Sequence, residues 1–518
     1  MNYFPKLVNT TIGDNMDKSY WVDSTKSTNY PTLEKNITTD VCIIGGGLVS
    51  AITGYLLTKQ GIKVTILEKN RVCMGVTAYS TAKLTSQHGL FYKYLESNFN
   101  FNFAKDYLDS NQEAISLAKK IIDDEHISCD FEPQDAYVFT TSKQEVEKIA
   151  DEVKVVKSLG LEAEYLTKLP LPLENILAAI KFPNQAQFNA RKFALALFDI
   201  IHKNNNEIYE NSKVTDINYK NHMYNISAND YTVCAKHVVM ATHYPIKNFP
   251  GFYFLKMYQD KSYIIAVDTK EDLFNGMFVS SWDPVTSFRT VPYGDTRLLL
   301  VVGSEHKTGA TDVPVENSFK NLENYIKNIY PNSEVKYRWS TQDCVTLDKV
   351  PYIGEFSHLL PNLYVATGFK KWGMTTSFVS AKIISDKILG KTNPYEHIYN
   401  ATRLAPIKNS KEFSNMLKQS TYSLLINKLS VPEASYSDIN LGSGGIINYN
   451  GEKIGIYKDD SGNVFAVKPY CKHLGCELSW NNLEKTWDCP CHGSRYDYQG
   501  QIINEPTTKE LDKIDLKE

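Results

Sequence analysis

The chain has 518 residues, of which 42% are hydrophobic and 22% are charged, with 56 Lys and Arg against 59 Asp and Glu. This length allows about three domains, and the composition is that of a globular protein with large cores. A formal net charge of -3 does not favour a nucleic-acid partner, which would call for a surplus of basic residues.

The N-terminal residues show no basic segment followed by an apolar one, so we expect no signal peptide. The longest apolar stretch, residues 41–57, is interrupted by glycines and does not reach the run of about 18 residues that a membrane span needs. We therefore expect a cytoplasmic protein without a membrane span.

In chain order, residues 1–37 are predicted to form an N-terminal arm that packs through Tyr20 and Trp21. A β-α-β unit begins at Asp40. A linker is predicted at residues 401–436, with one amphipathic helix near 411–429, and a Gly-rich, β-like segment follows it. Between them the apolar spacing predicts helices over 105–125, 143–159 and 189–203, β-like runs over 207–242, a strand-rich region over 258–303, and a strand followed by a helix over 362–389.

The first β-α-β unit carries a pattern for binding a dinucleotide. Its first turn reads Gly45-Gly46-Gly47-Leu48-Val49-Ser50, which fits G-x-G-x-x-G with Ser in the third glycine position. Gly45 permits the tight turn, and Gly47 lets the backbone approach a pyrophosphate at the helix N-terminus, where free N–H groups favour anions. Glu68 ends the second strand, where an acid accepts hydrogen bonds from ribose hydroxyls.

Three features favour FAD over NAD. The cradle lies near the N-terminus, while further cofactor-like segments recur hundreds of residues later. Residues 77–89 are polar and small, which suits the lining of a flavin. Residues 362–375 end a strand at Gly368 and begin a helix near Gly373, whose N-terminus could face the flavin edge where charge develops on reduction. No second G-x-G-x-x-G lies inside a β-α-β unit, which indicates that a small substrate reduces the flavin directly.

These segments resemble the D-amino-acid oxidase/glycine oxidase superfamily of FAD oxidoreductases over residues 38–400. The resemblance includes Val214, residues 238–242 (VVMAT) and residues 348–354 (DKVPYIG). It implies an α/β fold, in which a substrate domain with an antiparallel sheet interrupts a Rossmann-type FAD-binding domain. We place the FAD-binding segments at about 38–100, 185–245 and 340–400, and the substrate domain at about 101–184 and 246–339.

The expected contacts with FAD follow from the glycine motif and from the resemblance. Lys370, Lys371 and Trp372, which lie between two glycines, could border the flavin. The expected FAD-binding residues are Gly45, Gly46, Gly47, Leu48, Val49, Ser50, Glu68, Lys69, Thr77, Thr81, Ala82, Val214, Ala241, Thr242, Gly368, Gly373, Met374 and Thr375.

The nine cysteines include four near the C-terminus that are interleaved with histidines. The pattern Cys471-x-His473, fifteen residues, Cys489-x-x-His492 offers one thiolate and one imidazole from each of two loops. This set suits a [2Fe–2S] cluster with one iron on two Cys and the other on two His. The alternative is a zinc site of the finger type, which more often pairs Cys with Cys and His with His.

The pattern resembles a Rieske domain, and more narrowly the Rieske proteins of cytochrome bc complexes. By this resemblance Cys476 and Cys491 form a disulfide that ties the loops together. It also implies that the hydroxyls of Ser494 and Tyr496 donate to a bridging sulfide and a ligand thiolate, which raises the cluster potential above ~0 mV. We place this all-β domain at residues 437–518.

Candidate substrate-handling residues are fewer and less specific. Arg289 could clamp a carboxylate through two hydrogen bonds, or it could form a surface ion pair. His306 and His88 are candidate proton carriers, although a lone histidine more often has a structural role. Tyr263 and Trp282 could form pocket walls, where core aromatics are also common.

Together the two sites predict an electron relay. A small substrate, by resemblance an amine or an amino acid, reduces FAD. Single electrons then pass to the cluster and leave through the exposed imidazoles of His473 and His492 to an external one-electron acceptor. The alternative is a non-catalytic electron carrier or redox sensor, and the extended substrate domain favours the enzyme.

Overall fold

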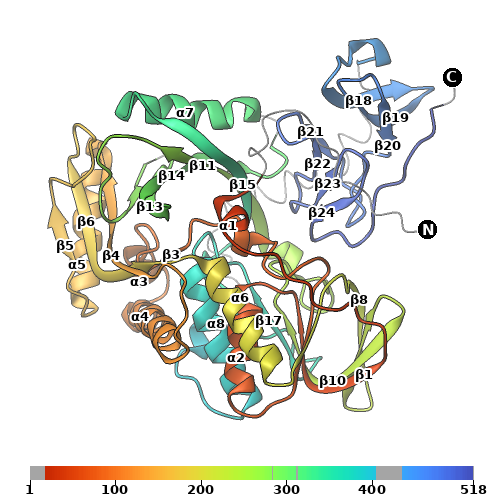
Figure 1. Ribbon diagram of the computed structural model, residues 1–518, viewed down its shortest axis with the longest axis horizontal. Helices are drawn as coiled ribbons and strands as arrows, with labels where there is room; N and C mark the ends of the chain where they lie inside the picture. Colours follow the sequence, from red (N-terminus) through yellow and green to blue (C-terminus); the bar gives the residue numbers. More distant parts are fainter. Residues whose placement is uncertain (1–17, 283, 311–312, 404–433, 517–518) are drawn as a thin grey trace.

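The computed structural model describes residues 18–282, 284–310, 313–403 and 434–516. These residues form a dinucleotide-binding domain, a second domain built on a large sheet, and a C-terminal β-domain (Figure 1). The helix predicted near 411–429 lies outside the described residues. Within the described part of the chain, no helix combines the length and the hydropathy of a membrane span.

An eight-stranded sheet forms the centre of the dinucleotide-binding domain. Its inner strands pair in parallel, whereas β16 (Tyr352–Glu355) and β9 (Met223–Ala228) pair antiparallel with their neighbours. The strand order is β16, β17 (Leu363–Thr367), β10 (Tyr231–Met240), β1 (Ile37–Ile44), β2 (Val64–Leu67) and β7 (Glu207–Tyr209), and β9 and β8 (Val214–Lys220) extend from β10.

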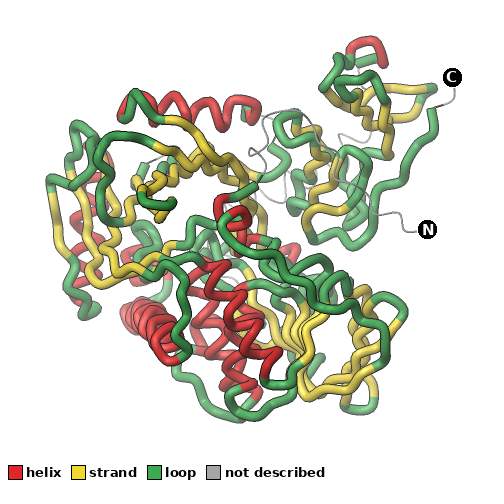
Figure 2. The backbone as a smooth tube through the Cα atoms, viewed as in Figure 1, coloured by secondary structure: helices red, strands yellow, loops and turns green. Residues whose placement is uncertain are grey.

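Both faces of this sheet are covered, as the unbroken apolar run at the end of β1 predicts. Val41 and Ile43 share a core with α2 (Leu48–Thr58), α6 (Ala190–Lys203) and α8 (Gly373–Ile388), which pack together (Figures 1 and 2). Cys42 and Ile44 point into a second core on the other face. The short helix α1 (Tyr20–Asp23) is anchored by its buried residues Tyr20 and Trp21.

The second domain is built on a nine-stranded sheet, antiparallel except where β12 (Met277–Ser280) pairs with β4 (Glu132–Thr140). In order, its strands are β15 (Glu334–Thr346), β11 (Met257–Asp268), β14 (Thr296–Lys307), β13 (Ser287–Tyr293), β12, β4, β6 (Ala178–Gln187) and β3 (Lys83–Leu84), with β5 (Glu164–Leu166) paired to β6. Its helices are α3 (Tyr92–Asn98), α4 (Phe101–Asp124), α5 (Val146–Ser158) and α7 (Ser318–Ile329).

Helix α4 begins one turn before the predicted start at residue 105. The Asn100 side chain accepts a hydrogen bond from Phe103 N at 2.8 Å and so caps the helix. The buried face of the helix already includes Ala104, so the cap at Asn100 is the signal that marks this earlier start.

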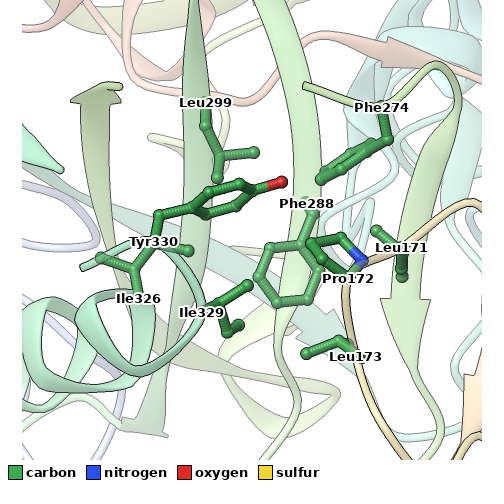
Figure 3. Close-up of a pocket in the computed structure, with 9 residues that line it drawn as sticks. All are labelled: Leu171, Pro172, Leu173, Phe274, Phe288, Leu299, Ile326, Ile329 and Tyr330. Carbon is green, nitrogen blue, oxygen red and sulfur yellow. The ribbon is translucent and has the colours of Figure 1, made fainter. Parts of the chain in front are cut away.

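The two faces of the large sheet have different neighbours. Tyr263 and Ile265 of β11 pack in the core beneath α7, whereas Ile264 and Ala266 join the core that is shared with the dinucleotide-binding domain. A small apolar pocket lies on the α7 face (Figure 3). It is therefore separated by the sheet from the dinucleotide-binding domain. Its lining residues are Leu171, Pro172, Leu173, Phe274, Phe288, Leu299, Ile326, Ile329 and Tyr330.

The C-terminal domain consists of two antiparallel sheets, and the indole of Trp487 is buried in its core. The first sheet contains β18 (Ser443–Tyr449), β19 (Glu452–Lys458) and β20 (Val464–Val467). The second contains β21 (Ser479–Asn481), β22 (Thr486–Asp488), β23 (Arg495–Asp497) and β24 (Ile502–Asn504).

A buried ion network joins this domain to β11. The ammonium of Lys261, a fully buried side chain, pairs with Glu484, and Arg495 reaches the same carboxylate at 3.0 Å. Arg495 also pairs with Asp488 at 2.9 Å. Although burial by itself raises the pKa of Glu484, the charges of Arg495 and Lys261 outweigh it and lower this pKa to about 2. The docked state therefore keeps Glu484 ionised.

We expect Glu484→Gln to destabilise the docked protein by about 3 kcal/mol at pH 7, because a carboxyl whose pKa falls from about 4.5 to about 2 stabilises the folded state above its unfolded pKa. The loss should shrink as the pH falls from 4.5 towards 2, where the wild-type carboxyl also becomes protonated. Denaturant unfolding at several pH values measures it, with Asp124→Asn in an exposed helical ion pair as the control. A pH-independent difference would contradict this origin.

Candidate cofactor sites

The glycine turn of the predicted cradle lies between β1 and α2. Gly45 has a φ of 99°, and a Cβ there would lie 2.6 Å from the carbonyl oxygen of Ala241, so only glycine fits. Gly47 immediately precedes α2, and the nearest atom to a Cβ on it would be Thr77 Oγ1 at 3.4 Å. The backbone thus leaves space for a pyrophosphate beside the helix N-terminus, in agreement with the predicted FAD site.

Glu68 follows β2 and turns its carboxylate toward the cradle. Its Oε2 accepts a hydrogen bond from Gly46 N at 2.7 Å, and its Oε1 accepts one from Asn70 N at 2.9 Å. Burial raises its pKa. This position suits the acid that binds the ribose. The neighbouring Lys69 pairs with Glu505 of the C-terminal domain, so its ammonium is already engaged away from the predicted FAD contact.

The two predicted flavin-lining segments lie next to each other although they are far apart in the sequence. Thr375 Oγ1, in the first turn of α8, accepts a hydrogen bond from Thr85 N at 2.9 Å and donates one to Thr85 O at 2.8 Å. The other predicted FAD contacts lie on these segments, in the first turn of α2, or at the ends of β8 and β10: Thr77, Thr81, Ala82, Gly368, Gly373 and Met374; Leu48, Val49 and Ser50; Val214, Ala241 and Thr242.

Arg289 is buried against the first of these segments. Its Nη1 donates hydrogen bonds to the carbonyl oxygens of Thr81 and Ala82, at 2.7 and 2.6 Å, and burial lowers its pKa to about 9. The guanidinium therefore positions the predicted flavin lining. A carboxylate clamp, as the sequence predicts, would have to use the remaining N–H groups.

His88 stacks on Trp372 with ring centroids 4.8 Å apart, which places the tryptophan beside the same segment. Its Nδ1 lies 2.7 Å from the Tyr107 hydroxyl and its Nε2 lies 2.8 Å from Thr85 O. Burial lowers its pKa to about 3, so the ring is neutral near pH 7. Both ring nitrogens are engaged, which is typical of a structural histidine and does not support the predicted role as a proton carrier.

Tyr263 and His306 lie on the α7 face of the sheet. Their side chains contact each other, with 3.3 Å between the Tyr263 hydroxyl and His306 Nε2, and Tyr263 packs against Phe319 of the α7 helix. Trp282 packs edge-on against Phe139 in the same core. Alternation along the strands turns these side chains away from the dinucleotide-binding domain, so their placement does not support the predicted contacts with substrate.

The opposite face of the sheet carries acidic residues that were not predicted as part of the site. Lys371, from the loop before α8, pairs with Glu305 at 2.6 Å and donates to Ser262 Oγ at 2.8 Å. Asp260 and Asp343 lie directly opposite each other on β11 and β15. Burial raises the pKa of Asp260 to about 7 and that of Asp343 to about 6. Asp260 and Asp343 each interrupt a segment whose sequence is otherwise typical of a strand. This interruption was the signal that could have indicated a functional role.

The four predicted iron ligands come together in the C-terminal domain. Hydrogen bonding from Cys489, Ser494 and Tyr496 lowers the pKa of Cys471 and favours the thiolate that binds metal. The rings of His473 and His492 lie 5.1 Å apart, and both Nδ1 atoms are buried without a hydrogen-bond partner. Burial lowers the pKa of His473 to about 4 and that of His492 to about 3, so both are neutral ligands near pH 7. These orphaned ring nitrogens fit a [2Fe–2S] cluster.

A disulfide joins the two cysteines of these loops that are not predicted iron ligands. The sulfurs of Cys476, Cys489 and Cys491 lie within 4.8 Å of one another, and Cys476 and Cys491 are joined as a disulfide. The disulfide leaves Cys489 as the free thiol of its loop, in agreement with its predicted role as an iron ligand. The Tyr496 hydroxyl lies 3.6 Å from Cys471 Sγ, and Ser494 is fully buried beside it.

The histidine edge of this centre lies against the segment between β10 and β11. The Phe254 ring contacts both His473 and His492 edge-on, at centroid distances of 5.7 and 5.8 Å. His473 Nε2 lies 3.3 Å from Asn248 Oδ1. His492 is only 5% exposed and His473 is half-buried. The structure therefore differs from the expectation that both imidazoles are exposed.

Two buried glutamines hold the loop that carries His492. Gln259 of β11 donates to His492 O at 2.7 Å, and Gln342 of β15 donates to Gly493 O at 2.7 Å and also to Gln259 Oε1. Both are polar residues inside strands, and no local pattern in the sequence connects them with a distant cluster loop.

Comparison with known proteins decides the family. The chain matches the model of the FAD dependent oxidoreductases over residues 40–387 and that of the Rieske [2Fe-2S] domain over residues 430–515. The chain belongs to the FAD-dependent oxidoreductase family. It carries a C-terminal Rieske domain. The predicted cofactors, FAD and a [2Fe–2S] cluster, and the predicted enzyme class, an oxidoreductase, are thereby confirmed.

Individual relatives cover the whole chain or its flavin-binding part. YhfW of Bacillus subtilis (strain 168), named for a Rieske 2Fe-2S iron–sulfur centre, is 35% identical over 98% of this chain and 100% of its own. Gamma-glutamylputrescine oxidoreductase of Escherichia coli (strain K12) is 22% identical over 74% of this chain and 91% of its own. The crystal structure of glycine oxidase from Geobacillus kaustophilus shares the fold, with a TM-score of 0.61 and 22% identity over 72% of this chain and 100% of its own.

Two glycine variants should separate folding from FAD binding. We expect Gly45→Ala to destabilise the protein, because its Cβ meets the Ala241 carbonyl. Gly47→Ala should keep the thermal stability of the FAD-free protein but lose most bound FAD, because its Cβ enters the space for the pyrophosphate. Thermal unfolding and the flavin absorbance per protein measure the two effects. Full FAD content in Gly47→Ala would contradict this placement.

The hydroxyl beside the cluster should raise its potential. Removing one hydrogen bond of about 1 kcal/mol corresponds to roughly 40 mV for a one-electron couple, so Ser494→Ala should lower the midpoint potential by about that amount. A redox titration followed by EPR measures it. Ser461→Ala, at an exposed position in the turn between β19 and β20, serves as the control. An unchanged potential in Ser494→Ala would contradict a role for this hydroxyl.

Proposed function

We propose that this protein is a flavin-dependent dehydrogenase that oxidises a small amine or amino acid and relays the electrons through its Rieske cluster to an external one-electron acceptor. Bound FAD would supply two-electron oxidation of the substrate, and the bound cluster would supply one-electron transfer. The observation that carries the proposal is the docking of the second cluster loop on β11 and β15, of which β15 also contacts the loop before α8.

A short chain of contacts links the two candidate sites. Gln342 donates to Gly493 in the second cluster loop, and two residues farther along β15 the Cys344 carbonyl accepts a hydrogen bond from Lys370 N at 3.0 Å. Lys370 belongs to the loop that leads into α8, where the flavin edge is expected. One strand thus holds the cluster loop and the predicted flavin loop, which supports electron transfer within the chain.

The acidic face described above supports an amine-type substrate. Asp260, Glu305 and Asp343 present carboxyl groups on the side of the sheet that faces the loop before α8, and Lys371 bridges to one of them. Carboxylates on this face would attract an ammonium group, and Lys371 would attract a carboxylate. Gamma-glutamylputrescine oxidoreductase and glycine oxidase are named for substrates with an amino group, which agrees with this chemistry.

Anaerobic mixing with a panel of amines and amino acids tests the proposal. We expect one or more of them to bleach the flavin absorbance, followed by a second phase in which the cluster becomes reduced. In Cys489→Ser, which lacks one ligand of the cluster, the flavin should still bleach and the second phase should be absent. This variant separates substrate oxidation from the relay.

Two further outcomes would point away from this function. Bleaching by NAD(P)H alone would contradict direct reduction by a small substrate. No bleaching by any compound, together with reversible reduction of both cofactors by dithionite, would favour the alternative, a non-catalytic electron carrier or redox sensor.

A further inference from the structure

An exposed apolar surface adjoins the half-buried ligand His473. The side chains of Phe249, Phe252 and Leu255, from the segment between β10 and β11, are 58%, 41% and 46% exposed, and Leu474, next to His473, is 43% exposed. We call these four residues the Phe249 patch. Large apolar side chains that gather on a surface commonly mark an interaction site.

Aromatic contacts connect this patch to the cluster ligands. Phe249 and Phe252 contact each other edge-on, with ring centroids 5.1 Å apart, and both contact Phe254, at 6.1 and 6.2 Å. Phe254 in turn contacts His473 and His492. A molecule bound on the patch would therefore be separated from the two histidines by little more than the Phe254 ring.

The backbone holds one of these rings outward at a conformational cost. Phe252 has a φ of 52° and a ψ of 36°, the left-handed region that bulky residues rarely adopt. Such conformations persist where the surrounding structure enforces them, and they cluster at functional sites. A phenylalanine whose ring is simply buried in a core would not require this left-handed backbone conformation.

The charged residues in the segment that carries three of the patch residues are both basic. The segment Ile246–Lys256 contains two lysines, Lys247 and Lys256, and no acidic residue. Among the described residues neither lysine forms an ion pair: Lys247 donates to the Ile217 carbonyl, and Lys256 lies over the rings of Tyr253 and Tyr352. A partner with acidic residues around an apolar centre would complement this surface.

We propose that the Phe249 patch is the docking surface for the external redox partner, a small acidic protein that carries one electron. In each encounter one electron crosses between the partner's centre and the cluster through the imidazole edge. One centre is oxidised, the other is reduced, and no covalent bond forms or breaks. The inference rests on the proposed function only in assuming that the chain exchanges electrons with another molecule.

Reduction of the oxidised cluster by a reduced, acidic plant-type [2Fe–2S] ferredoxin tests the surface, because this transfer is downhill to any Rieske potential. It needs neither substrate nor flavin turnover, so its result is independent of the proposed dehydrogenase activity. Stopped-flow absorbance of the holoprotein gives the second-order rate constant. We expect this constant to fall steeply with salt, and to fall about tenfold or more in Phe249→Ser and in Lys247→Glu.

Matched variants and probes separate a protein partner from a membrane surface or a second copy of the chain. Phe101→Ser removes another exposed aromatic, 44% exposed on α4, and should leave the rate constant unchanged. The rate of reduction by dithionite should be the same in every variant. A rate constant that is unaffected by Phe249→Ser and Lys247→Glu, or no reduction by the ferredoxin, would overturn the proposal. It would also be overturned if Phe249→Ser abolished binding to phosphatidylglycerol vesicles, which would indicate a membrane surface, or dissociated a dimer in sedimentation velocity, which would indicate a second copy.

Discussion

Strands β11 and β15 touch both candidate cofactor sites, and this shared support determines how the two sites are placed. Gln259 and Gln342 hold the second cluster loop by its carbonyl groups, and β15 pairs with the loop that leads into α8. The buried pair of Lys261 and Glu484 fixes the same strands to the Rieske domain. Such a pair is costly to break, because removing one partner leaves a buried charge. The second cluster loop is thus held in one place relative to the loop before α8.

Successive residues of β11 point to opposite faces of the sheet and contact different parts of the molecule. On β11, Gln259 and Lys261 point to the Rieske domain and Tyr263 points under α7, whereas Ser262 points to the loop before α8. One strand therefore serves the relay on one face and the predicted substrate side on the other. A change of register by a single residue would exchange these roles, which explains why the register of β11 against β15 matters for both sites.

Short segments of the sequence were sufficient to predict the two cofactors, FAD and the [2Fe–2S] cluster. The glycine turn at residues 45–47, its acid Glu68 and the spacing of Cys471, His473, Cys489 and His492 each lie within short segments whose residues suffice to indicate a ligand. The substrate-side residues could not be predicted in this way. Which face of a strand Tyr263 or Asp260 occupies depends on packing against α7 and on the docking of another domain, and a strand pattern that is apolar on both faces does not reveal it.

The sequence likewise could not predict how the Rieske domain docks on the rest of the chain. The expectation of two exposed imidazoles came from isolated cluster loops, whereas here Phe254 and Asn248 cover much of their edge. Beside the half-buried His473 lie the exposed side chains of the Phe249 patch, where we propose that another molecule makes contact. Internal transfer and external exchange would therefore use neighbouring parts of the same imidazole edge.

The proposed relay requires electron transfer from the flavin to the cluster within a single chain. Flash photoreduction of the flavin in the holoprotein without substrate, followed by the absorbance of the cluster, measures this step directly. We expect a rate constant that is unchanged over a hundredfold range of protein concentration. A rate that rises in proportion to protein concentration would show transfer between molecules and would contradict a relay within the chain.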